Sequence, residues 1–152
     1  MRFHLIDRID RIEPNQHVLA RKITSHREDY WRDDGRGPEM PPSLVFEALC
    51  QAGTWLVMTS TELARRAALL SVDAVTFGAP VRPGDVLRLE GSVESIGPEM
   101  AVLSGRASVG DLTVLEAESI MCALMPTEEL EDLDDVRRMQ RQLARVASGR
   151  AA

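Results

Sequence analysis

The stretch SLVFEALCQAGTWLVM, residues 43–58, decides the fold of this chain. Ser43 is a favourable helix N-cap, and residues 44–58 then continue for about four turns with apolar side chains on nearly every side. A helix without a polar face is stable only when something larger surrounds it. We therefore expect one long helix at the centre of the protein.

Two strongly polar side chains, Glu47 and Gln51, interrupt this apolar helix. Their spacing of four residues places them on the same helix face. Burial of an unpaired carboxylate is so unfavourable that the group becomes neutral or finds a partner. Glu47 is therefore expected either to face a cavity or to be paired, and a structural and a catalytic role remain equally open.

The segments around this helix have the pattern of β-strands. One strand is predicted at 18–24 and four more at 74–77, 85–96, 100–109 and 112–124, with short turns at 97–99 and 110–111 that favour antiparallel hairpins. In LRLEGSVE, residues 87–94, polar residues recur at every second position, which is typical of a sheet with one face in the core. The pattern predicts the α+β class, with a curved antiparallel sheet around the helix and exposed edges able to pair into a dimer.

The remaining segments divide the chain into a domain at 1–126 and a C-terminal extension at 127–152. In the extension, acidic residues precede arginines and one narrow apolar stripe recurs, which predicts a surface helix packed on the sheet or on a partner chain. Residues 24–42 form an irregular stretch. A loop of this length in a small domain usually has a functional role.

Composition excludes several classes of function. The chain has 152 residues and 18 basic against 24 acidic side chains, a net charge of −6 that argues against nucleic-acid binding. No apolar stretch is long enough to span a membrane or to act as a signal peptide, so a cytoplasmic location is expected. Cys50 and Cys122 lie in apolar runs without metal-ligand spacing, so we expect two buried thiols and no metal site.

Two motifs reveal a family resemblance. Residues 40–53, MPPSLVFEALCQAG, resemble the MPGxLxxEAxAQA motif of the hotdog-fold 3-hydroxyacyl-acyl-carrier-protein dehydratases, and residues 77–89, FGAPVRPGDVLRL, resemble the family's FxxPVxPGDxLxL segment. The resemblance extends over roughly residues 3–125. It implies a hotdog dimer with substrate tunnels at the subunit interface.

The resemblance also implies a reaction, the reversible loss of water from a 3-hydroxyacyl thioester carried on phosphopantetheine, with no further cofactor. In that family a histidine removes a C2 proton, a helix carboxylate from the other subunit handles the 3-hydroxyl, and the N–H of the motif glycine polarises the thioester carbonyl. Glu47 matches the carboxylate. Gln51, Pro42, Ser43 and Gly78 fall within the matched motifs and are expected to contact the substrate.

Two of the three catalytic groups are replaced. Asp33 stands at the histidine position, or Asp34 if the loop shifts by one residue, and no histidine follows His26 in the chain. Pro42 replaces the glycine and has no N–H to donate. Loss of an oxyanion donor typically lowers the rate by about 10²–10³, and loss of a general base by about 10²–10⁴.

Three functional hypotheses follow. In the first, the chain is the non-catalytic subunit of a heterodimer with an active dehydratase in fatty-acid or polyketide biosynthesis, and Glu47 completes the site that contains the partner's histidine. In the second, it is an enzyme by itself, either a dehydratase with Asp33 or Asp34 as base or a thioesterase in which a carboxylate activates water. In the third, it binds acyl thioesters without catalysis. Each involves an acyl carrier protein, for which Arg82 and Arg36 are candidate docking residues in a homodimer or heterodimer.

Overall fold

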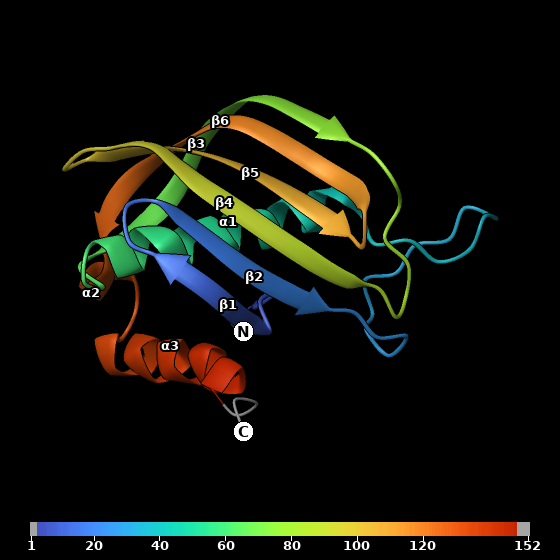
Figure 1. Ribbon diagram of the computed structural model, residues 1–152, viewed down its shortest axis with the longest axis horizontal. Coiled ribbons are helices and arrows are strands. Elements are labelled where there is room, and N and C mark those ends of the chain that lie inside the picture. The colour runs from blue at the N-terminus through green and yellow to red at the C-terminus, as the bar shows by residue number, and fades with distance from the viewer. Residues whose placement is uncertain (1–2, 149–152) are drawn as a thin grey trace.

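A single curved sheet wraps around one long helix in the computed structural model, which describes residues 3–148 and the side chains as far as residue 144 (Figure 1). The elements are β1 (Arg8–Glu13), β2 (His17–Ile23), α1 (Pro42–Ser60), β3 (Arg65–Phe77), β4 (Val86–Ile96), β5 (Met100–Val109), β6 (Leu112–Pro126), α2 (Thr127–Leu130) and α3 (Leu133–Ser148). The sheet is antiparallel, with strand order β1-β2-β4-β5-β6-β3. The predicted α+β class and the helix wrapped by a curved sheet are confirmed.

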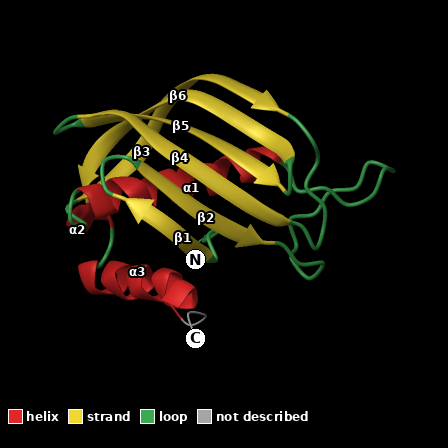
Figure 2. Ribbon diagram, in the orientation of Figure 1, coloured by secondary structure: helices red, strands yellow, loops and turns green. Residues whose placement is uncertain are grey.

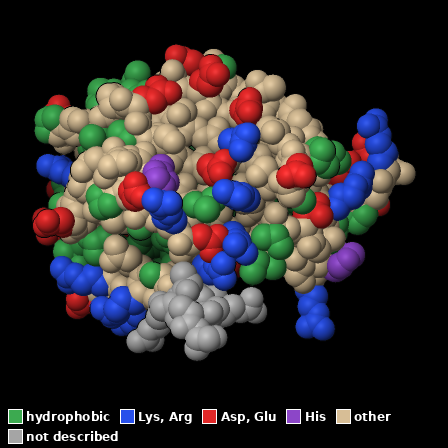
Figure 3. Space-filling view, viewed as in Figure 1, with side chains coloured by type: hydrophobic (Ala, Val, Ile, Leu, Met, Phe, Trp, Pro, Cys, Tyr) green, Lys and Arg blue, Asp and Glu red, His purple; other side chains and the backbone are tan. Residues whose placement is uncertain are grey.

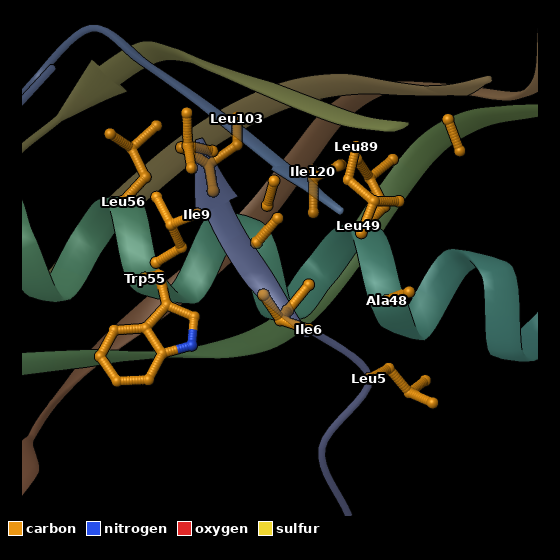
Figure 4. Close-up of a cluster of buried hydrophobic side chains, with 14 of the residues drawn as sticks. Leu5, Ile6, Ile9, Ala48, Leu49, Trp55, Leu56, Leu89, Leu103 and Ile120 are labelled. Carbon is orange, nitrogen blue, oxygen red and sulfur yellow. The ribbon is translucent and has the colours of Figure 1, made fainter. Parts of the chain in front are cut away.

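The core lies between α1 and the concave face of the sheet (Figure 4). Leu49 and Leu56 of α1 are buried there with Leu103 of β5. Two glycines allow the helix to lie close to the sheet: a Cβ on Gly53 would stand 2.9 Å from Leu103, and one on Gly105 would stand 2.9 Å from Leu49. This close packing holds the polar residues of α1 in fixed positions relative to the strands.

The start of α1 differs from the prediction. The helix begins at Pro42 with Pro41 as its N-cap residue, and no side chain caps it, so the assignment of Ser43 as the N-cap is wrong. Proline suits the first helical position because its missing N–H would have no partner within the helix and its φ is already helical. The carbonyl of Pro41 accepts the first helical hydrogen bonds, from the N–H groups of Leu44 and Val45.

The edge strands differ most from the sequence pattern. β3 extends over 13 residues, whereas only residues 74–77 were predicted, and β1 was not predicted at all. Along β3 burial does not alternate, because the strand pairs only with β6 and both of its faces are partly open. Without a period of two, the pattern contains no strand signal over residues 65–73.

The C-terminal extension packs on its own chain, in contact with β1 (Figure 2). A four-residue helix, α2, and a 16-residue helix, α3, replace the single predicted helix. α2 ends at Leu130, and the Asp132 carboxylate accepts hydrogen bonds from the N–H groups of Asp134 and Asp135 at the start of α3. Val136 and Leu143 of α3 are buried. Residues 149–152 of the predicted helix lie outside the described part of the chain. Within residues 3–148, no helix is both long and apolar enough to span a membrane.

Candidate active site

Glu47 is held in place by Gln51, one turn further along α1. The Gln51 side-chain amide donates hydrogen bonds to Glu47 Oε1, at 3.0 Å, and to the carbonyl of Phe3, at 3.0 Å. The Gln51 oxygen accepts a hydrogen bond from the N–H of Leu5, at 2.8 Å. One amide therefore orients the carboxylate and anchors the N-terminal segment beneath the helix.

The carboxylate borders a mostly apolar cavity of about 180 Å³ between α1 and the sheet. Its wall includes Glu47, Cys50 and Thr54 from the helix and Leu103, Ile120 and Cys122 from the strands. Glu47 thus both faces a cavity and is paired, although in the single chain its side chain is exposed. We call this space the acyl cavity, after the acyl chain that the family resemblance leads us to expect there.

The two thiols that border the acyl cavity are poorly reactive near neutral pH. Burial, with a smaller contribution from the charge of Glu47, raises the pKa of Cys50 to about 12, and burial also raises the pKa of Cys122. A thiol is nucleophilic and binds metal only as the thiolate, so neither cysteine is suited to these roles near neutral pH. Cys122 is buried as predicted, but Cys50 is only partly buried because it borders the cavity. Among the side chains that the structure describes, residues 3–144, no cluster of three or more metal-ligating groups occurs.

The two candidate bases lie on the loop before α1. Asp33 Oδ1 accepts hydrogen bonds from the N–H groups of Gly35 and Gly37, both of which have positive φ, so this carboxylate shapes the loop. Asp34 accepts a hydrogen bond from the N–H of Arg36. Both aspartates are exposed and border an open depression beside Pro42, not the acyl cavity. One chain by itself therefore does not bring either aspartate into the cavity that Glu47 borders.

The other predicted contact residues fall into separate places. Pro42 and Gly78 border the same cavity, of about 270 Å³, whereas the exposed Ser43 borders a different depression. Gly78 lies against β6: its N–H donates to the carbonyl of Val114, and a Cβ at this position would stand 2.3 Å from the carbonyl oxygen of Thr113. The structure thus places Gln51 in hydrogen-bond contact with Glu47, and Pro42 and Gly78 at one cavity. Ser43 lies at neither place.

The two candidate docking arginines differ in their surroundings. Arg82 reaches back to the loop before α1, where it contacts Glu39 at 3.2 Å and donates to the carbonyl of Pro38 at 3.3 Å. Arg36 is 80% exposed and lies 3.8 Å from Asp34. Basic side chains stand on the protruding loop in Figure 3. Arg82 therefore braces the loop, while Arg36 is open to a ligand.

Two ion pairs were not predicted from the sequence, although Arg66, beside Arg65, is a possible docking residue on sequence grounds. Arg66 of β3 borders the acyl cavity and forms an ion pair with Glu131, which follows α2. At the start of the loop, the buried Lys22 pairs with Glu28. Burial opposes ionisation of Glu28, but hydrogen bonds from Lys22 and Tyr30 outweigh it and lower the pKa. No local pattern signals the Arg66–Glu131 pair, because the two residues are far apart in sequence.

Comparison with known proteins identifies the family. Residues 1–118 match the FabA-like domain family. The 3-hydroxyacyl-acyl-carrier-protein dehydratase FabZ of Chloroflexus aggregans is 35% identical over 128 residues, which cover 83% of this chain and 89% of that protein.

Solved structures agree on the fold. The dehydratase heterocomplex ApeI:P from Xenorhabdus doucetiae matches with a TM-score of 0.63 and 15% identity, over 90% of this chain and 88% of the other. A Streptococcus mutans protein bound to acetyl CoA matches with a TM-score of 0.66 and 16% identity, over 83% and 94% of the two chains. These structures share the hotdog fold with this chain. The chain therefore belongs to the FabA-like family of hotdog-fold proteins.

Proposed function

We propose that this protein is the non-catalytic subunit of a dehydratase heterodimer. The heterodimer acts on 3-hydroxyacyl thioesters that an acyl carrier protein carries on phosphopantetheine, in fatty-acid or polyketide biosynthesis. One observation carries the proposal: Gln51 holds Glu47 at an apolar cavity. By the sequence resemblance, Asp33 or Asp34 falls at the family's histidine position and Pro42 at its glycine position. The chain has kept the group that a partner's site requires and lacks the groups that its own site requires.

The reaction divides between the two subunits. Loss of water breaks the C2–H and C3–O bonds and forms a C2–C3 double bond. A histidine of the partner takes the C2 proton, and the carboxyl group of Glu47 gives a proton to the departing 3-hydroxyl. The hydrogen bond from Gln51 to Glu47 keeps the carboxyl group in one orientation for this transfer.

The outer strand β3 supports a second subunit in this position. It is a 13-residue edge strand, and Leu69, Leu70 and Phe77 are 50%, 57% and 57% exposed. Long apolar edges favour pairing with another strand. Because Leu69 also borders the acyl cavity, a subunit paired along β3 lies beside Glu47 and can complete the site.

Two further observations agree with the proposal. The structurally similar protein from Xenorhabdus doucetiae is a dehydratase heterocomplex, so this fold is compatible with the assembly of two different chains. Acyl carrier proteins are acidic, and Arg36 offers an exposed positive charge at the loop before α1, with Arg82 bracing that loop from behind.

The test measures turnover of a 3-hydroxyacyl-carrier-protein substrate, with mass spectrometry for water loss and for thioester cleavage. We expect no reaction by the single chain. With an active dehydratase that co-purifies with it, we expect water loss that Glu47→Gln in this chain abolishes at the mixed site. Water loss or free acid produced by the single chain, and removed by Glu47→Gln, would contradict the proposal and make Asp33 or Asp34 the candidate base.

A further inference from the structure

The acyl cavity shares part of its lining with a second cavity. This second cavity, of about 130 Å³, lies between α1, the N-terminal segment and α3, where Trp55 and Val136 border it. Gln51, Thr54 and Arg66 border both cavities. These three side chains are therefore the partition between the two spaces.

An ion pair closes this partition. The guanidinium of Arg66 pairs with the carboxylate of Glu131, and Glu131 itself borders the second cavity. The two side chains are 34% and 17% exposed, so both are partly shielded from water. An apolar chain that passed this point would have to separate the two charges or remove them further from water, and both changes are unfavourable.

The order of residues along α1 sets the direction of a bound acyl chain. Glu47 lies near the start of the helix, and Cys50 and Thr54 follow on the same side, towards the partition. A substrate with its 3-hydroxyl at Glu47 therefore extends its remaining carbons past Cys50 and meets Arg66 at the far end.

We propose that the Arg66–Glu131 pair is the end wall of the acyl cavity and restricts the protein to short and medium acyl chains. This inference rests on the proposed function. A cavity of 150 Å³ accommodates benzene, with six carbons, so 180 Å³ holds about seven carbons beyond C3, which corresponds to acyl groups of up to about ten carbons. The second cavity holds about five more if the wall opens.

The C-terminal extension contributes one half of this wall. Glu131 and α3 lie beyond residues 1–118, the part that matches the family model. Arg66 lies on β3, within the matched part, so the ion pair connects the two parts of the chain. The proposed end wall therefore depends on a residue of the C-terminal extension.

The test is direct binding by the full chain, measured by calorimetry, of 3-hydroxyacyl-pantetheine thioesters with four, eight, twelve and sixteen carbons. We expect the eight-carbon ligand to bind at least about tenfold more tightly than the sixteen-carbon ligand, a difference of about 1.4 kcal/mol. Arg66→Ala should reduce this ratio to about threefold or less, a change of about 0.7 kcal/mol. Arg65→Ala is the matched control, because successive strand residues point to opposite faces and Arg65 borders neither cavity.

Glu131→Ala removes the other partner of the ion pair and should reduce the same affinity ratio, in case Arg66→Ala does not fold. Equal affinity for all lengths in the unmodified chain, or an unchanged ratio in both folded variants, overturns the end wall and leaves the proposed function in place. Failure of the chain to bind a thioester of any length also overturns the end wall, whereas the proposed function is decided separately, by the turnover assay with the partner dehydratase.

Discussion

The amide of Gln51 allows a sharp test of how the site is held together. Gln51→Leu replaces a side chain that makes three hydrogen bonds, to Glu47, Phe3 and Leu5, with an apolar side chain of similar size. Each hydrogen bond contributes about 1 kcal/mol, and the freed groups of the N-terminal segment regain part of this from water. We therefore expect the free energy of unfolding to fall by about 2–3 kcal/mol, which lowers Tm by about 5–10 °C in a chain of this size.

Glu47→Gln is the matched control for this measurement. The new side chain keeps an oxygen that accepts the hydrogen bond from Gln51, so we expect its free energy of unfolding to lie within about 0.5 kcal/mol of the unmodified chain. Urea denaturation measures both values, and hydrogen exchange reports the N–H of Leu5, which should exchange faster only in Gln51→Leu. If Gln51→Leu matched the unmodified chain in both assays, the argument that Gln51 anchors the N-terminal segment would be refuted.

Three further predictions concern other parts of the structure. Gly78→Ala places a Cβ 2.3 Å from the carbonyl oxygen of Thr113, so we expect the free energy of unfolding to fall by about 2 kcal/mol. Thermal unfolding measures this change, and an unchanged stability would contradict the contact. Glu28→Gln removes the main charge partner of the buried Lys22 and should lower stability by about 2 kcal/mol at neutral pH. Folding lowers the pKa of Glu28, so the difference in free energy of unfolding between the unmodified chain and Glu28→Gln should persist above pH 4.5, the usual pKa of a glutamate. The difference should disappear as the pH falls through the folded-state pKa of Glu28, and a difference that is constant with pH would refute the role of this carboxylate. Cys50, with its pKa near 12, should react with iodoacetamide at pH 8 about a thousandfold more slowly in the folded chain than in urea, and equal rates would exclude the raised pKa.

The sequence alone was sufficient for the centre of the molecule. An apolar run with helical length predicts the central helix, and alternation with short turns predicts the hairpins of β4, β5 and β6. Local spacing also placed Glu47 and Gln51 on one helix face, which the hydrogen bond between them bears out. These features depend on residues that are close together in the chain, so pattern and propensity report them directly.

Tertiary structure decided the extent of β3 and the shape of the site. β3 continues over its full length because β6 pairs with it, although its residues 65–73 lack a strand pattern. Gln51 holds the N-terminal segment, and Arg66 meets Glu131 across the partition between two cavities, only because folding brings distant segments together. Such contacts lie between residues that are far apart in sequence, so no local pattern encodes them. The sequence by itself determines which chemical groups the protein carries. Tertiary packing decides which of these groups face the same cavity.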